Sequence, residues 1–179
     1  MKKFELYLIE MSIGKAAALA AKSHAGQYRK GSGASYIVHP TAVYRILRAI
    51  GVKDRVVLVA AFLHDTIEDT PISYNAIKKE FNKEVADLVK EVTSIKKDLE
   101  KLGKEDYLIA KMVKMSNSAL IIKLADRLHN LRDITSMPQM SIKKLRSNTK
   151  YIISQLTEKR KLNNTHKKII RDIKKEIEK

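Results

Sequence analysis

Apolar residues recur at helical spacing along most of this chain. In segment 119–134, ALIIKLADRLHNLRDI, leucine and isoleucine return every three or four residues, which puts them on one side of a helix. Glycine and proline are few, six and three among 179 residues, and several fall where helices should begin or end. Pro40 suits a first helical turn, Gly51 ends the helix that follows it, and Thr70-Pro71 breaks the next. The pattern predicts an all-α fold, a helical bundle.

Expected helices follow one another with short connections. The sequence predicts them at 12–26, 41–50, 54–68, 74–92 (as two short helices or one bent one), 105–116 and 118–134, then from 141 onward, with a thin, highly charged amphipathic helix at 159–179. The stretch YRKGSGASYIVHP (28–40) has three small turn formers and an extended YIV, so a short β-hairpin or extended segment is expected near 31–38. The polar residues 94–106 are expected to form a loop or mobile lid.

The length suits one domain with a real core. The chain has no cysteine, which excludes disulfides and thiolate-bound zinc. Glu5 and Glu10 interrupt the stretch where a signal peptide would need apolar residues, and no apolar run approaches the ~20 residues of a membrane-spanning helix. We therefore expect a cytoplasmic protein without a membrane segment.

The net charge of +16 is unevenly distributed. Residues 141–179 contain thirteen Lys and Arg against four Asp and Glu. This surplus attracts polyanions, such as nucleic acid, anionic lipid or phosphorylated small molecules, although such a run can equally be a solvated face without a specific partner. We expect a main domain over 1–157 and a basic C-terminal helical extension over 158–179. The oligomeric state is not predicted.

The segment FLHDTIEDT (62–70) ends an apolar run in four titratable groups. On one helix, His64 and Asp65 lie four residues before Glu68 and Asp69, so the four groups form one patch. Three carboxylates beside an apolar run are costly, because each raises the pKa of the others and resists burial. A divalent cation removes that cost, and imidazole with carboxylate suits Mn²⁺, Fe²⁺, Zn²⁺ or Mg²⁺. The alternative is that no metal binds here and the charged end of this helix is simply exposed to solvent.

Two further residues complete a possible ligand set. His39 lies just before a proline at a helix start, and Asp126 lies near the edge of the buried stripe in 119–134. Alone, His39 could be a helix cap or a core histidine, and Asp126 could pair with Lys123 or Arg127. Together they give the order H…HD…D, four ligands on separate elements.

That order is the pattern of the HD-domain metal-dependent phosphohydrolases. HAGQYRKGSGASYIVHP, FLHDTIEDT and IKLADRLHNLRDI further resemble the hydrolase half of RelA/SpoT proteins, and especially the small stand-alone alarmone hydrolases. The likeness covers roughly residues 12–157. One departure is Ala34-Ser35, where members of this family commonly have a proline.

The resemblance implies an HD-domain helical bundle and a Mn²⁺-dependent enzyme that removes the 3′-diphosphate from (p)ppGpp and so ends stringent-response signalling. By this resemblance the ligands of one divalent ion are His39, His64, Asp65 and Asp126. Glu68 and Asp69 match a family ED motif that positions and deprotonates the attacking water. The implied substrate contacts are Arg29, Lys30, Asn130 and, more weakly matched, Arg132.

Two other hypotheses remain. The first keeps the enzyme but changes its substrate to another nucleotide with a 2′- or 3′-phosphate, hydrolysed by a phosphatase reaction. The second belongs to a different class, an RNA- or ribosome-binding protein that uses the basic tail and has a vestigial HD site. The complete set of ligands and the intact Glu68-Asp69 pair argue against a decayed site.

Overall fold

The computed structural model describes residues 2–95, 100, 103–134 and 136–179, with side chains from residue 11 onward. Within this part of the chain the structure is helical, as predicted, and the one β feature is an isolated bridge. The helices are α1 (Lys2–Ser23), α2 (Val38–Ala49), α3 (Arg55–Leu63), α4 (Thr66–Asp69), α5 (Tyr74–Glu80), α6 (Lys83–Val92), α8 (Lys104–Lys114), α9 (Asn117–Arg132), α10 (Gln139–Lys159) and α11 (Asn164–Ile177).

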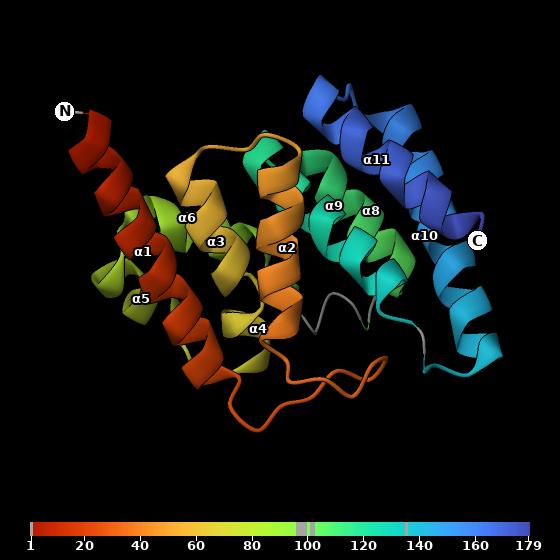
Figure 1. Cartoon of the computed structure of the whole chain (residues 1–179). Coiled ribbons are helices and arrows are strands. Elements are labelled where there is room, and N and C mark those ends of the chain that lie inside the picture. Colours follow the sequence, from red (N-terminus) through yellow and green to blue (C-terminus); the bar gives the residue numbers. More distant parts are fainter. Residues whose placement is uncertain (1, 96–99, 101–102, 135) are drawn as a thin grey trace.

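Two helices, α3 and α9, form the centre of the bundle. Every residue of α3 from Val57 to Leu63 is buried, and α1, α2 and α6 pack around it. Helix α9 contacts α2, α3, α6 and α11. Helix α2 packs against both α3 and α9. Its first turn lies beside the C-terminal end of α3 (Figure 1).

The helix predicted over 54–68 is divided in two. Helix α3 ends at Leu63, and α4 begins at Thr66 after a bend at His64 and Asp65. The imidazole of His64 contacts the carbonyl oxygen of Ala61 at 2.8 Å, and the hydroxyl of Thr66 donates to the carbonyl of Leu63 at 2.7 Å. Side-chain hydrogen bonds of this kind compete with the backbone ladder and bend a helix. The bend turns His64 and Asp65 toward α2 and α9.

The predicted hairpin near 31–38 is a loop closed by one antiparallel bridge between Tyr28 and Ser35. The YIV stretch is not extended as expected, because Ile37 already has helical backbone angles and α2 begins at Val38. Gly31 lies so close to the backbone of Asp133 that a Cβ there would overlap its carbonyl. The loop therefore packs directly on the end of α9.

The remaining helices lie close to their predicted positions, except that α1 begins at Lys2, ten residues before the predicted start, and ends at Ser23. Residues 74–92 form two helices, α5 and α6, capped by the side chains of Ser73 and Asn82. The predicted loop over 94–106 falls partly on residues 96–99 and 101–102, which lie outside the described residues. None of the helices in the described part of the chain combines the length and the apolar character needed to span a membrane.

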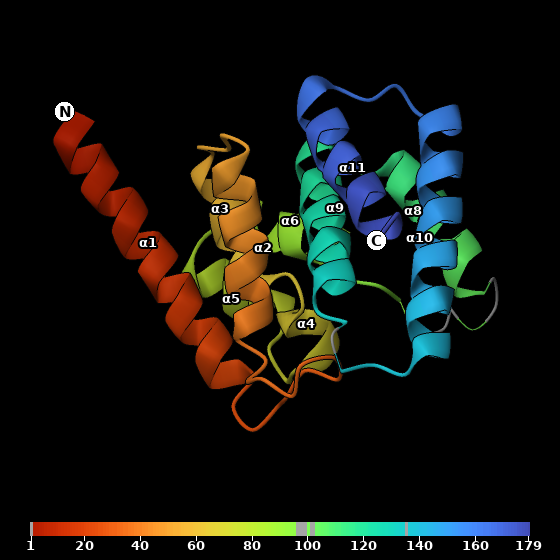
Figure 2. The same cartoon turned by 45° about the vertical axis from the view of Figure 1, so that its right-hand side comes forward.

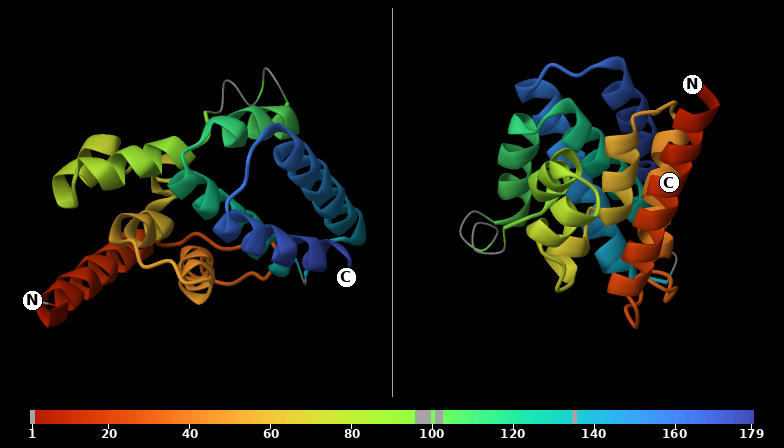
Figure 3. Two further views of the ribbon diagram at one scale, coloured as in Figure 1. Left: turned by 90° about the horizontal axis from the view of Figure 1, so that it is seen from above. Right: turned by 90° about the vertical axis from the view of Figure 1, so that its left-hand side faces the viewer.

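The C-terminal helices pack against the bundle at the end opposite α1. Helix α10 packs on α8, and α11 packs on α9, with Ile169, Ile170 and Ile173 buried (Figure 2). Seen from above, α10 and α11 flank one end of the molecule while the N-terminus lies at the other (Figure 3). The boundary between a main domain ending at 157 and an extension stays a prediction.

Candidate functional site

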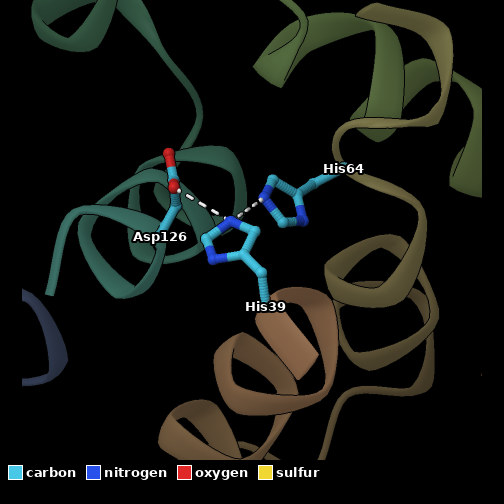
Figure 4. A group of neighbouring side chains, drawn as sticks. All are labelled: His39, His64 and Asp126. Atoms are coloured by element: carbon cyan, nitrogen blue, oxygen red, sulfur yellow. Dashed lines mark hydrogen bonds and ion pairs between the residues drawn. The ribbon is translucent and has the colours of Figure 1, made fainter. Parts of the chain in front are cut away.

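Four side chains with nitrogen or oxygen atoms that could bind a metal converge between α2, α3, α4 and α9. The Nε2 atoms of His39 and His64 are 3.2 Å apart. Nε2 of His39 lies 3.3 Å from Oδ1 of Asp126, and Nε2 of His64 lies 3.1 Å from Oδ2 of Asp65. Figure 4 shows His39, His64 and Asp126 pointing at one another from three different helical segments. Their ligand atoms all lie within 4.8 Å of one another.

The donor set fits a divalent cation. Nδ1 of His64 faces the carbonyl oxygen of Ala61, so it carries the hydrogen and leaves the lone pair of Nε2 directed at the cluster. Both histidines are 1% exposed. Two imidazole nitrogens and two carboxylates at such short separations suit a cation that accepts mixed nitrogen and oxygen ligands. We therefore identify His39, His64, Asp65 and Asp126 as a candidate metal centre.

The electrostatics of the cluster favour positive charge at this point. Burial by itself lowers the pKa of His39, but hydrogen bonds to Asp126 and Asp65 outweigh it and raise that pKa to about 9. Although burial opposes ionisation of Asp126, Lys123 and His39 hold the pKa of this carboxyl well below its usual range. Asp65 behaves in the same way beside His64 and His39. Both carboxylates are therefore ionised and available as ligands at neutral pH.

Surrounding side chains orient these donors. The hydroxyl of Tyr36 donates to Oδ2 of Asp65 at 2.7 Å, and Nδ2 of Asn130 donates to Oδ1 of Asp126 at 2.6 Å. Nδ1 of His39 lies 2.8 Å from Nδ1 of His129. No role is predicted for Tyr36 or His129 from the sequence. The sequence contains no signal for these contacts, because each joins residues far apart in the chain: Tyr36 contacts Asp65, and His129 contacts His39.

Glu68 and Asp69 face different parts of the site. Glu68 lines the small inner cavity, about 180 Å³, that also contains His39, Asp65 and Asp126. Its Oε2 accepts a hydrogen bond from the backbone nitrogen of Ser94 at 2.7 Å. Asp69 lines the larger outer cleft, where its Oδ2 lies 3.3 Å from the hydroxyl of Tyr36. Of the two carboxylates, Glu68 is the one beside the candidate metal centre.

The outer cleft has a volume of about 1060 Å³ and is rich in basic side chains. This size is at the upper end of small-molecule sites. Its cationic lining residues are Arg29, Lys30, Lys104, Arg127 and Lys144. Arg29, Tyr36, Lys104, Leu108, Arg127 and Asn130 also line the inner cavity, so the two spaces share a wall. The basic cleft thus opens onto the cavity beside the candidate metal centre.

Three of the four predicted substrate contacts lie in this cleft. Arg29 donates from Nη2 to Oδ1 of Asn130 at 2.6 Å and from Nε to Asp133 at 2.7 Å. Lys30 and Asn130 also line the cleft. Arg132 does not line the cleft, and its Nε pairs with Glu176 of α11 at 3.2 Å, so its contact with substrate stays a prediction. Arg132 follows Asn130 by two residues and so points to a different side of α9.

The comparisons with known proteins agree with this geometry. A family model described as an HD domain matches residues 16–162. The human protein named guanosine-3′,5′-bis(diphosphate) 3′-pyrophosphohydrolase MESH1 is 43% identical over 122 residues, 67% of this chain and 68% of its own length. A protein of Mycobacterium leprae named probable GTP pyrophosphokinase is 41% identical over 129 residues, 70% of this chain. The chain spans only 16% of that longer protein.

A solved structure shares the fold of most of this chain. It is described as a metazoan ortholog of SpoT that hydrolyzes ppGpp and plays a role in starvation responses, and it superimposes with a TM-score of 0.77 at 32% identity. The superposition covers 92% of this chain and 94% of the other. Fold and family model together define the class: the chain belongs to the HD domain family.

Proposed function

We propose that this protein is a Mn²⁺-dependent pyrophosphohydrolase that removes the 3′-diphosphate from (p)ppGpp. The observation that carries the proposal is the convergence of two histidines, two aspartates and Glu68 at the floor of a basic, nucleotide-sized cleft. The printed activity of the human relative, at 43% identity, supports the same reaction. Such an enzyme acts on a cytoplasmic nucleotide, so we place it in the cytoplasm.

In this proposal His39, His64, Asp65 and Asp126 hold one divalent ion. When bound, such an ion lowers the pKa of water toward neutrality and withdraws charge from a phosphoryl oxygen. Mn²⁺ accepts mixed imidazole and carboxylate ligands, which is the set offered here. Tyr36, Asn130 and His129 keep the donors in position through the hydrogen bonds described above.

Glu68 has the position of a general base. One of its oxygens is held by the backbone of Ser94, which leaves the other to orient water and take its proton. The oxygen of that water bonds to the phosphorus attached to the 3′ oxygen of the ribose. The bond between that phosphorus and the 3′ oxygen breaks, and the 3′ oxygen takes up a proton in place of the one that Glu68 accepted, so it becomes a hydroxyl and pyrophosphate and GDP or GTP are released. Asp69 lines the outer cleft and not the inner cavity, so we assign the role of general base to Glu68 and not to Asp69.

Arg29 and Lys30 offset the charge of the substrate. A guanidinium contacts phosphate through two nitrogens, whereas Lys30 offers a single mobile charge. Asn130 links Arg29 to Asp126, and so couples the phosphate contacts to the metal centre.

Product analysis with purified protein tests the proposal and separates it from its alternatives. The protein is incubated with Mn²⁺ and either ppGpp or nucleotides that have a single 2′- or 3′-phosphate, and the products are separated by ion exchange. Pyrophosphate and GDP from ppGpp are the expected products. Inorganic phosphate from the monophosphorylated nucleotides, with ppGpp left intact, would instead assign a phosphatase. Absence of turnover for every nucleotide would contradict both enzyme hypotheses.

A further inference from the structure

A second basic hollow lies outside the cleft, between the end of α10 and the length of α11. It encloses about 720 Å³. Its basic lining residues, here called the basic groove, are Arg160, Lys161, Lys167, Arg171, Lys174 and Lys175. Glu178 is the one acidic residue in the lining, and Leu162 and Ile170 contribute apolar surface. None of these residues lines the cleft assigned to the proposed hydrolase.

The positive charge of the basic groove is poorly compensated within the molecule. Glu176, the best-placed acid on α11, is already paired with Arg132 at 3.2 Å and Lys179 at 2.7 Å. Among the described residues, the one ion pair of Asp172 is with Arg171, at 3.9 Å. Among the described residues, Lys161, Lys167, Lys174 and Lys175 have no ion-pair partner, and all four are exposed. Their field is therefore directed outward, toward an external anion.

The positive surface continues along α10. The basic residues that line a neighbouring hollow of about 800 Å³ are Lys143, Arg146 and Lys150, and Nε of Arg146 is buried without a hydrogen-bond partner in the described part of the chain. The apolar part of its lining consists of Met140, Ile142 and Ile177. Lys143, Lys150 and Thr157 follow one another at seven-residue intervals, so they lie on one face of α10. At about 1.5 Å per residue this face extends for about 20 Å, the length of about six base pairs of a duplex.

The packing of α11 argues against an anionic membrane as the partner. A helix that binds a lipid surface must insert its apolar face between the headgroups. In α11 that face is already covered, because Ile169 and Ile173 are fully buried and Ile170 is 5% exposed, packed against α9. What remains exposed on α11 is mostly charged. This charged surface suits a rigid ligand that presents a row of hydrated phosphate groups.

We propose that the basic groove binds the phosphate backbone of double-helical nucleic acid. None of the described residues that line the two hollows is aromatic, so unstacked bases of a single strand have no ring to stack on. Lysine and arginine contacts to phosphate need no base sequence and produce binding that weakens steeply with salt. Helix α10 separates this surface from the cleft, because Lys144 and Asn148, on another face of α10, line the cleft.

The test uses the full chain and a fluorescent DNA duplex of mixed sequence, with binding followed by anisotropy as the salt concentration is varied. In the groove variant, Lys161, Lys167, Arg171 and Lys174 are all changed to Gln. The matched control changes Arg48, Lys53, Lys78 and Lys79 to Gln, exposed residues far along the chain from α10 and α11, with the same loss of charge. Arg160 is left unchanged because it donates to carbonyl groups at the end of α8.

We expect the groove variant to bind the duplex at least about tenfold more weakly than the wild type, with a shallower salt dependence, and the control to change less than about threefold. Equal weakening in both variants would overturn the proposal, because it would reflect net charge alone. Tighter binding to a single strand, binding to anionic vesicles in place of the duplex, or failure of the wild type to bind at low salt would also overturn it.

A second measurement does not depend on the folding of the variants. Lysine acetylation of the wild-type chain, with and without the duplex, is mapped by mass spectrometry. Protection of Lys167 and Lys174 with unchanged labelling of Lys78 and Lys79 is the expected result, and the reverse pattern would refute the site. Neither experiment requires the proposed hydrolase activity, so the two proposals can fail separately.

Discussion

His39 has a contact at each of its ring nitrogens. Nε2 faces His64, Asp65 and Asp126, while Nδ1 lies 2.8 Å from Nδ1 of His129. For Nε2 to offer its lone pair to a metal, the hydrogen must sit on Nδ1, and Nδ1 of His129 must accept it. Burial, with His39 and Arg29 nearby, lowers the pKa of His129 to about 4, so that ring is neutral at pH 7. His129 is thus a positioning residue for His39.

Replacing His129 tests this role. In His129→Leu the acceptor is lost, and we expect affinity for Mn²⁺ to fall by roughly tenfold to a hundredfold, as is usual when a partner behind a metal ligand is removed. In His129→Asn the side-chain oxygen can take the place of Nδ1, so most of the affinity should return. Calorimetric titration with Mn²⁺ measures both. Equal affinity in the Leu variant and the wild type would show that His39 needs no orienting partner.

At the scale of elements, the loop 28–35 is fixed to the end of α9. Arg29 reaches Asn130 and Asp133, and Gly31 packs against the carbonyl group of Asp133 with no room for a side chain. The loop that contributes Arg29 and Lys30 to the cleft is therefore positioned by backbone contact as well as by ion pairing.

Gly31→Ala should displace this loop and weaken substrate binding. Because the added Cβ would overlap backbone atoms, the loop must shift, and we expect KM for ppGpp to rise by roughly tenfold with a smaller change in kcat. Gly14→Ala is the matched control, since a Cβ at Gly14 meets nothing within 4 Å. Steady-state kinetics distinguish the two. If Gly31→Ala had the same KM as the control, the close approach of Gly31 to Asp133 would not be needed for substrate binding.

The positions of the helices could be predicted from the sequence more accurately than the breaks between them. Helix α9 followed from its apolar spacing, and the capping of α5 followed from Ser73. The break between α3 and α4 could not be predicted, because it depends on side-chain hydrogen bonds of His64 and Thr66 that only the folded chain reveals. The convergence of His39, His64, Asp65 and Asp126 was expected from their order. The pairing of Arg132 with Glu176 was not, since it depends on how α11 docks.

At the scale of the whole molecule, His166 joins α11 to α9. Its Nδ1 accepts from the backbone nitrogen of Asn163 at 3.3 Å, completing a capping box, and its Nε2 contacts the carbonyl oxygen of Asn117 at 3.2 Å. Only the neutral ring, with its hydrogen on Nε2, serves both contacts. Burial is the main reason that the pKa of His166 lies below its ordinary 6.5.

This arrangement predicts lower stability in mild acid. Below about pH 6.5 the unfolded chain binds a proton at His166 more readily than the folded chain, so the free energy of unfolding falls as the pH drops through that value. Above it, the contribution is fully present. His166→Gln, with a neutral residue that also suits this capping position, should show a smaller decrease in Tm between pH 7.5 and 5.5 than the wild type. An identical decrease in both would contradict the account.

The proposed reaction depends on one divalent ion. His39, His64, Asp65 and Asp126 would bind this ion, and Glu68 would act on water beside it. The most direct measurement of this dependence is pyrophosphate release from ppGpp by chelator-treated protein during titration with Mn²⁺, with bound metal counted in the same samples. Activity should rise in proportion to bound Mn²⁺ and saturate at about one ion per chain. Asp126→Ala should bind no Mn²⁺ under these conditions, and Glu68→Ala should bind it yet lose at least about a hundredfold in rate. Full activity in the chelated protein, or in Glu68→Ala, would contradict this proposal.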